Sequence, residues 1–169
     1  RLVGHGHVVV IEADPWSADA LENYAHRHGL APRVILFRCG AWSERTELKL
    51  LFNLHHPASG VMEECAKGQA PRTSSSHGRI TVPVNTLDSL LEQAGVPTPR
   101  VVSITTNGAE LEILKGMQRC FGAGLPYLSL APPRNRYASY VNALGYDLMC
   151  SDDRGFFFKR RAATTNDWV

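Results

Sequence analysis

Two short segments of this chain carry polar side chains in positions where they could do chemistry. Glu12 ends the apolar run His7–Glu12, and Asn107 follows the β-branched run Val101–Thr105. Runs of this kind predict strands that are buried on both faces, as in parallel sheets. Ligands of such sheets bind beyond the carboxyl ends of the strands, so we expect Glu12, Thr105 and Asn107 to face one ligand site.

Glu12, with Ala13 beside it, is the first candidate ligand-binding position. A carboxylate at the end of a strand can accept hydrogen bonds from both hydroxyl groups of a ribose. An acid in front of Asp14-Pro15 fits a helix cap or an ordinary surface position as well. A nicotinamide dinucleotide enzyme would use an acid at the same place, so Glu12 alone does not identify the cofactor.

The segment Cys39-Gly40-Ala41 follows the next predicted strand, Val34–Phe37. Its small residues would let a flat ring approach the backbone closely. The same residues also fit an ordinary tight turn, and both interpretations stay open.

Thr105 and Asn107 are the candidates for contact with an acceptor molecule. Neither side chain is a general base at neutral pH, but the amide of Asn107 can orient a hydroxyl group. Thr105 can form a hydrogen bond to a cofactor or to the acceptor. The alternative is that Asn107-Gly108 only makes the turn after the strand.

The long segment Asn53–Gly78 lacks clear periodicity, which is typical of functional or disordered connections. His55 in this segment is a candidate base that reaches over the ligand site, although a solvated loop histidine is the commoner situation. We expect no metal site, because the four cysteines are widely spaced and form no C-x-x-C pair.

The remaining pattern alternates strands with helices, which predicts an α/β fold. The predicted helices are Trp16–Gly29 with Ser17 as its cap, Leu87–Ala94, Ala109–Gly116 and Arg136–Leu144. Further strands are predicted at Glu47–Phe52, Arg79–Val84 and Pro126–Leu130, followed by a hairpin of Tyr146–Cys150 and Phe156–Lys159.

Size and composition restrict the class of protein. A chain of 169 residues with 44% hydrophobic residues fits one globular domain, which we place at residues 1–160 with a frayed tail at 161–169. The formal charge of +2 gives no electrostatic case for nucleic acid. No apolar run approaches the length of a membrane span, and a cytoplasmic protein is expected, with a homo-oligomer left open.

The segment Val101–Met117, VVSITTNGAELEILKGM, resembles the signature of the FkbM-type S-adenosylmethionine-dependent methyltransferases. That signature reads roughly I-D-V-E-G-A-E-x-x-V/L-x-G. The matching positions are Ile104, Gly108, Ala109, Glu110, Leu114 and Gly116. Thr105 and Asn107 stand where the family has an Asp and a Glu, so this copy lacks both acids.

The resemblance implies a Rossmann-like class I methyltransferase sandwich, with a mostly parallel sheet and a C-terminal antiparallel hairpin. It implies S-adenosylmethionine as the cofactor and a hydroxyl group of a small molecule or sugar as the acceptor. Glu12 and Ala13 would then bind the ribose, and Cys39, Gly40 and Ala41 would line the adenine pocket. Glu110 is expected to cap its helix, because acids are favoured in a first helical turn.

The resemblance also implies that the family's first strand and Gly-rich loop are missing from this chain, with Arg1–Gly4 as the end of the following helix. That strand would lie between the strands at His7 and Val101. We therefore expect either another segment in this place or abnormal pairing of the two flanking strands.

Two functional hypotheses follow. The leading one is an O-methyltransferase domain, and its rival is a non-catalytic binding or assembly module with the same fold. A third, a fragment of a nucleotide-binding oxidoreductase, has only Glu12 in its favour and lacks a G-x-G-x-x-G motif.

Overall fold

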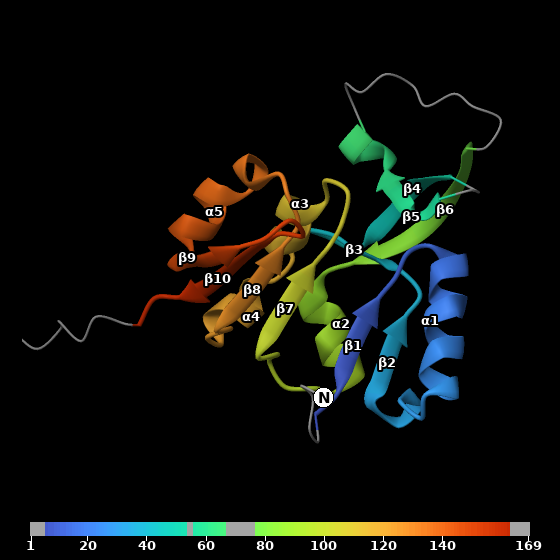
Figure 1. Ribbon diagram of the computed structural model, residues 1–169, viewed down its shortest axis with the longest axis horizontal. Coiled ribbons are helices and arrows are strands. Elements are labelled where there is room, and N and C mark those ends of the chain that lie inside the picture. Colours follow the sequence, from blue (N-terminus) through green and yellow to red (C-terminus); the bar gives the residue numbers. More distant parts are fainter. Residues whose placement is uncertain (1–5, 54–55, 67–76, 163–169) are drawn as a thin grey trace, which may run out of the picture.

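The computed structural model describes residues 6–53, 56–66 and 77–162, and its strands and helices alternate as the α/β prediction requires (Figure 1). The predicted end of a helix at Arg1–Gly4 lies outside the described residues. The described strands form three sheets. The first is a parallel pair, β1 (Val8–Ile11) and β2 (Val34–Phe37). The second has the order β3-β6-β4-β5, and the third has the order β7-β8-β10-β9.

The strand directions are mixed in the two larger sheets. In the third sheet, β7 (Val101–Ile104) is parallel to β8 (Tyr127–Leu130), and β10 (Phe156–Arg160) is antiparallel to both β8 and β9 (Tyr146–Ser151). The C-terminal antiparallel hairpin is thus confirmed. A single, mostly parallel sheet is not what the described strands form, because β1-β2 and β7-β8 belong to separate sheets.

Two strands that point in the same direction, β1 and β7, each have one unpaired edge (Figure 1). Among the described residues, β1 pairs with β2 alone and β7 pairs with β8 alone. The two strands line one cavity without forming a ladder with each other. Abnormal pairing of these strands, one of the two expected outcomes, is therefore not observed.

Helix α1 (Pro15–Arg27) begins earlier than predicted, because Asp14 and not Ser17 is its cap. The Asp14 carboxylate accepts hydrogen bonds from the backbone N–H groups of Trp16 and Ser17, at 2.9 and 3.4 Å. These bonds satisfy donors that lack a partner in a first helical turn, and Pro15 needs none. Gly29 ends the helix with a φ of 66°, as its sequence position predicts.

Four shorter helices follow, together with two 3₁₀ turns in the same half of the chain or nearby. Helix α2 is capped by Thr86, whose hydroxyl oxygen accepts from the N–H of Ser89 at 3.2 Å. The short helices are α2 (Leu87–Ala94), α3 (Glu110–Lys115), α4 (Gln118–Gly122) and α5 (Ala138–Ala143). The 3₁₀ turns are η1 (Ala31–Arg33) and η3 (Arg134–Arg136). None of the described helices is long and apolar enough to cross a membrane.

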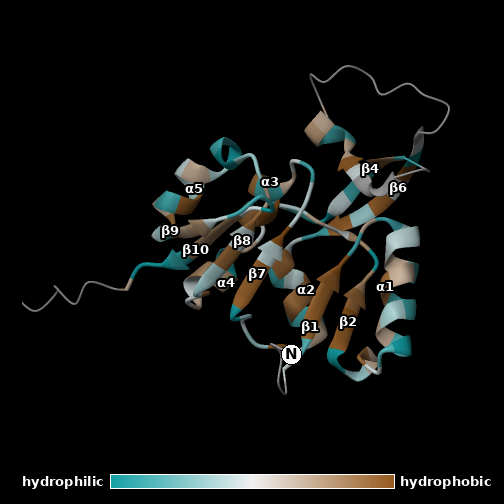
Figure 2. Ribbon diagram, viewed as in Figure 1, coloured by the Kyte–Doolittle hydropathy of each residue, from teal (hydrophilic) through white to brown (hydrophobic). Residues whose placement is uncertain are grey.

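The hydrophobic core lies on one face of the third sheet. Alternate residues of its strands, among them Ile104, Leu128 and Phe158, are buried in one cluster with Leu114 and Val141 from the helices. The opposite face carries exposed side chains, since Val101, Tyr127 and Phe157 are each at least 39% exposed. Hydrophobic residues dominate β1, β2 and β7, whereas α1 is largely hydrophilic (Figure 2).

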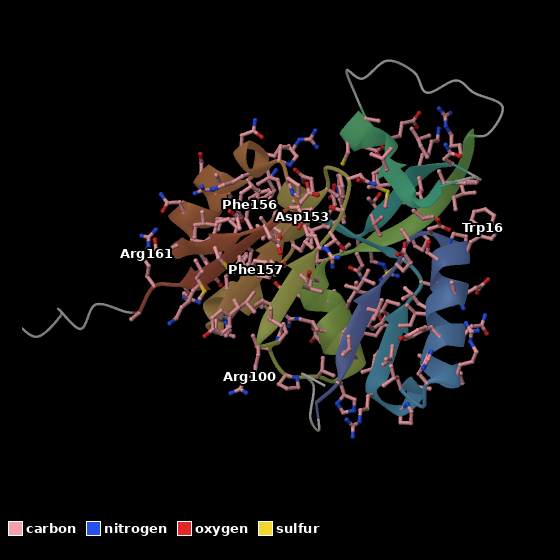
Figure 3. The ribbon with its side chains drawn as sticks, viewed as in Figure 1. Trp16, Arg100, Asp153, Phe156, Phe157 and Arg161 are labelled. Carbon is pink, nitrogen blue, oxygen red and sulfur yellow. The ribbon has the colours of Figure 1, made fainter. Side chains whose placement is uncertain are left out.

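The second sheet forms an arm, which we define as β4 (Thr46–Asn53), β5 (His56–Met62), η2 (Glu63–Ala66) and β6 (His77–Asn85). The interpretation of 53–78 as a structureless connection is wrong in part, because β5 pairs with β4 inside it. The short strand β3 (Gly40–Ala41) joins the arm through a parallel contact with β6. Trp16 of α1 stacks against Phe52 of β4, with ring centroids 4.8 Å apart, and Figure 3 shows Trp16 at the outer edge of the molecule.

Gly116 connects α3 to the rest of the core and generates a stability prediction. A Cβ atom at Gly116 would lie 2.2 Å from the backbone oxygen of Trp42, which cannot rotate away. We therefore expect Gly116→Ala to lower the free energy of unfolding by about 1–3 kcal/mol, as measured by urea denaturation.

The matched control is Gly122→Ala in the neighbouring helix α4, where a Cβ atom meets nothing within 4 Å. This substitution should leave stability unchanged or raise it by up to about 1 kcal/mol, because it restricts the unfolded chain. Equal effects of the two substitutions would show that the contact with Trp42 is absent.

Candidate functional site

A cavity of about 1430 Å³ lies between the open edges of β1 and β7. Its wall is built from three parts of the chain: the β1 side, the β7 side and strand β5 of the arm. Figure 3 shows Arg100 at the amino-terminal end of β7, with its side chain directed away from the molecule. The carboxyl ends of β1 and β7 carry Glu12 and Thr105, and both residues line the cavity.

Glu12 is held at the end of β1 by its own backbone and side chain. Its N–H donates to the carbonyl of Phe37 on β2 at 3.0 Å, which continues the parallel ladder. Its Oε1 accepts a hydrogen bond from the N–H of Asp14 at 2.9 Å. Among the described residues Oε2 has no hydrogen-bond partner, so the carboxylate can accept from a ligand hydroxyl while its orientation stays fixed.

Ala13, Cys39, Gly40 and Ala41 line the same cavity next to Glu12. Gly40 is buried, and a Cβ atom there would lie 2.8 Å from the side chains of Met62 and Val84. Burial raises the pKa of the Cys39 thiol above its usual value, so this side chain stays neutral at physiological pH. The segment therefore presents a small, uncharged surface to the cavity.

Thr105 and Asn107 line the cavity from the β7 side. The amide Nδ2 of Asn107 donates a hydrogen bond to the backbone oxygen of Gly60 at 2.8 Å, which ties the turn after β7 to the arm. The structure thus brings Thr105 and Asn107 to the cavity that Glu12 lines. Their catalytic roles remain predictions.

The turn between β7 and α3 depends on Gly108 and Glu110. Gly108 has a φ of 103°, a conformation that L side chains rarely adopt. Oε1 of Glu110 accepts hydrogen bonds from Thr106 Oγ1 at 2.9 Å and from Gly108 N at 3.2 Å. Glu110 therefore braces the turn in front of α3, whereas the sequence predicted a helix cap.

Glu110 is fully buried, and its second oxygen, Oε2, has no hydrogen-bond partner among the described residues. Leaving a buried polar atom without a partner costs about 1–3 kcal/mol. Groups of this kind occur where strain or function keeps them in place.

Two sets of residues near the cavity were not recovered from the sequence. Thr106 lines the cavity and bonds to Glu110, but nothing in the sequence separates it from Thr105. Gly60, Val61 and Met62 of β5 also line it, although their segment shows no strand periodicity. His55, the predicted base of the loop, lies outside the described residues.

The donor set fits a nucleoside at the β1 side. Glu12 offers a carboxylate oxygen for ribose hydroxyl groups, and Gly40 and Ala41 leave room for a flat ring. The β7 side offers neutral hydroxyl and amide groups that can orient a second molecule. Within the described part of the chain, no three His, Cys, Asp or Glu side chains are arranged to hold a metal ion.

Comparisons with known proteins agree with this geometry. The sequence model described as "Methyltransferase FkbM domain" matches residues 1–125. Among solved structures, the chain is similar to the methyltransferase FkbM from Methylobacillus flagellatus KT, with a TM-score of 0.60 and 17% sequence identity. That match covers 90% of this chain and 36% of the solved one, so this chain spans about a third of its length.

A comparison with the curated proteins gave no match. The structural likeness shows the fold, and the family match extends over most of the sequence. The chain therefore belongs to the FkbM family of methyltransferase domains.

Proposed function

We propose that this domain serves S-adenosylmethionine-dependent transfer of a methyl group to a hydroxyl group of a small molecule or sugar. One observation carries the proposal. Glu12, at the end of β1, and Thr105 and Asn107, after β7, line the same cavity although their strands belong to different sheets. A nucleoside subsite and an acceptor subsite in one cavity are what a group transfer requires.

In this proposal the β1 side holds the cofactor. Glu12 accepts hydrogen bonds from the ribose, next to Ala13, while Cys39, Gly40 and Ala41 pack beside the adenine. S-adenosylmethionine, when bound, supplies a methyl group on a positively charged sulfur. The uncharged surface beside Gly40 suits a neutral purine ring.

The β7 side and the arm would hold the acceptor. Thr105 and Asn107 carry hydrogen-bonding groups that can fix the direction of an acceptor hydroxyl. Strand β5 completes the wall through Gly60, Val61 and Met62, so the arm would shape acceptor specificity. We propose further that β1-β2 and β7-β8 are parts of one Rossmann-like sheet, because both pairs are parallel.

A non-catalytic binding module is the second candidate function, and one observation favours it. Asn107, which stands where the family has an acid, donates its amide to Gly60 of the arm. A side chain engaged in this way acts as an anchor between two parts of the fold. The module hypothesis keeps the cavity and assigns it to ligand binding alone.

Glu12 provides the first test of the proposed function. We expect Glu12→Gln to weaken binding of S-adenosylmethionine by at least about tenfold in calorimetry. The charged hydrogen bonds from a carboxylate to hydroxyl groups contribute about 1.5–3 kcal/mol each, and an amide cannot replace both.

Glu47→Gln is the matched control, since Glu47 is an exposed acid on the arm that does not line the cavity. It should bind the cofactor as the unaltered chain does. If Glu12→Gln binds equally tightly, the ribose assignment is wrong. Cofactor binding without methylation of any hydroxyl compound would favour the binding module.

Asn107 provides the second test, because an acid there cannot donate to the Gly60 carbonyl. We expect Asn107→Asp to raise the exchange rate of the backbone amides at Gly60–Met62 by roughly threefold to tenfold, the equivalent of one lost hydrogen bond. Hydrogen–deuterium exchange with mass spectrometry measures this rate.

Asn23→Asp on the exposed surface of α1 makes the same chemical change away from the arm and should have no effect there. Unaltered exchange at Gly60–Met62 in Asn107→Asp would mean that the arm does not depend on this anchor.

A further inference from the structure

Glu110 is a buried carboxylate that the proposed function has not yet used. Its side chain is 0% exposed, and it reaches the turn after β7 through a single oxygen, Oε1. The other oxygen, Oε2, has no hydrogen-bond partner among the described residues. A buried carboxylate with an unsatisfied oxygen retains the capacity to take up a proton.

Charged and titratable groups from two other elements surround this turn. The guanidinium of Arg136, in η3, packs over Gly108, and a Cβ atom on Gly108 would collide with it. Cys65 of η2 lies on the same side, and its thiol is affected by the charges of Glu110, Glu64 and Arg136. The hydroxyl of Tyr137 donates to the backbone oxygen of Ala131 at 2.7 Å.

The neighbouring acids of this cluster cannot serve as bases at neutral pH. Burial, and then the charges of Glu110 and Glu64, raise the pKa of Cys65 to about 11. Burial and the charge of Glu110 raise the pKa of Tyr137 to about 12. Both groups therefore keep their protons, and Thr105 and Asn107 are not bases either. Glu110 is the carboxylate that remains at this turn.

Thr106 connects Glu110 to the cavity. It lines the cavity wall beside Thr105 and Asn107, and its hydroxyl donates to Glu110 Oε1 at 2.9 Å. A hydroxyl that donates to a carboxylate can accept a hydrogen bond from a second hydroxyl at the same time. The contact thus links the cavity to a base that solvent does not reach.

The geometry points to a proton relay in which Thr106 is the catalytic contact with the acceptor hydroxyl and Glu110, acting through Thr106, receives the proton. This inference rests on the proposed methyl transfer. The acceptor oxygen forms a bond to the methyl carbon, the carbon–sulfur bond breaks, and its electron pair stays on sulfur. The acceptor proton moves to Thr106 Oγ1 as the proton of Thr106 moves to Glu110 Oε1.

Glu110→Gln tests the relay with little change of shape. A glutamine oxygen can still accept from Thr106 and Gly108, so a purely structural role predicts normal cofactor binding and a normal turn. The relay predicts a fall of about 10²–10⁴-fold in the rate of methyl transfer, with cofactor affinity unchanged. The wild-type rate should decline at acid pH, and the residual rate of Glu110→Gln should lose that dependence.

Thr106 supplies the matched pair of variants. Thr106→Val keeps the shape and removes the hydroxyl, so it should fall with Glu110→Gln, whereas Thr106→Ser should stay within about tenfold of wild type. Transfer is followed with radiolabelled S-adenosylmethionine and three hydroxyl probes, glycerol, glucose and catechol. Wild-type rates in both Glu110→Gln and Thr106→Val would overturn the relay.

A measurement without turnover decides the question if none of the probes is methylated. Carbon-13 NMR of glutamate-labelled protein, with Glu110 assigned from Glu110→Gln, follows the carboxyl during a pH titration. The relay requires an ionised Glu110 at pH 7, and it requires proton uptake to begin at higher pH in Thr106→Val, because a bond to the charged form is lost.

A Glu110 carboxyl that is neutral at pH 7, or that titrates identically in Thr106→Val, overturns the inference. Calorimetry with S-adenosylmethionine is carried out on the same samples. Failure of cofactor binding would count against the proposed function, and the NMR titration would report on the relay separately.

Discussion

The turn after β7 is the constraint on which the candidate site depends. Gly108 takes a backbone conformation that other residues rarely adopt, and the buried Glu110 accepts hydrogen bonds from Gly108 and Thr106. The turn is thereby held between the end of a parallel strand and the start of α3. Asn107 then extends from this turn to Gly60, so one short segment sets the positions of the cavity wall and of the arm.

The cavity itself is a consequence of strand pairing. A strand buried in the interior of a parallel sheet has partners on both sides, but β1 and β7 each have one partner among the described residues. Their open edges leave a space that reaches from His7 and Arg100 to Glu12 and Asn107. The polar ends of both strands open into this space, which is why a nucleoside side and an acceptor side can share it.

Local patterns were sufficient to predict most of the elements. The strand at Val34–Phe37 and the helix at Leu87–Ala94 have the predicted bounds, because apolar spacing and the Thr86 cap determine them locally. The start of α1 was misplaced by two candidate caps in one segment, Asp14 and Ser17, of which Asp14 forms the bonds. Strand β5 was missed, since its pairing with β4 supplies what its composition lacks.

The sequence alone determined the α/β class, the resemblance of Val101–Met117 to one family, and the polar residues at the ends of two strands. These features depend on residue type and short-range spacing, which a sequence displays directly. Only the tertiary structure decided that β1-β2 and β7-β8 form separate sheets, that Glu12 and Asn107 line one cavity, and that Glu110 is buried against Thr106. Those outcomes depend on contacts between distant segments, which packing selects and local propensity does not encode.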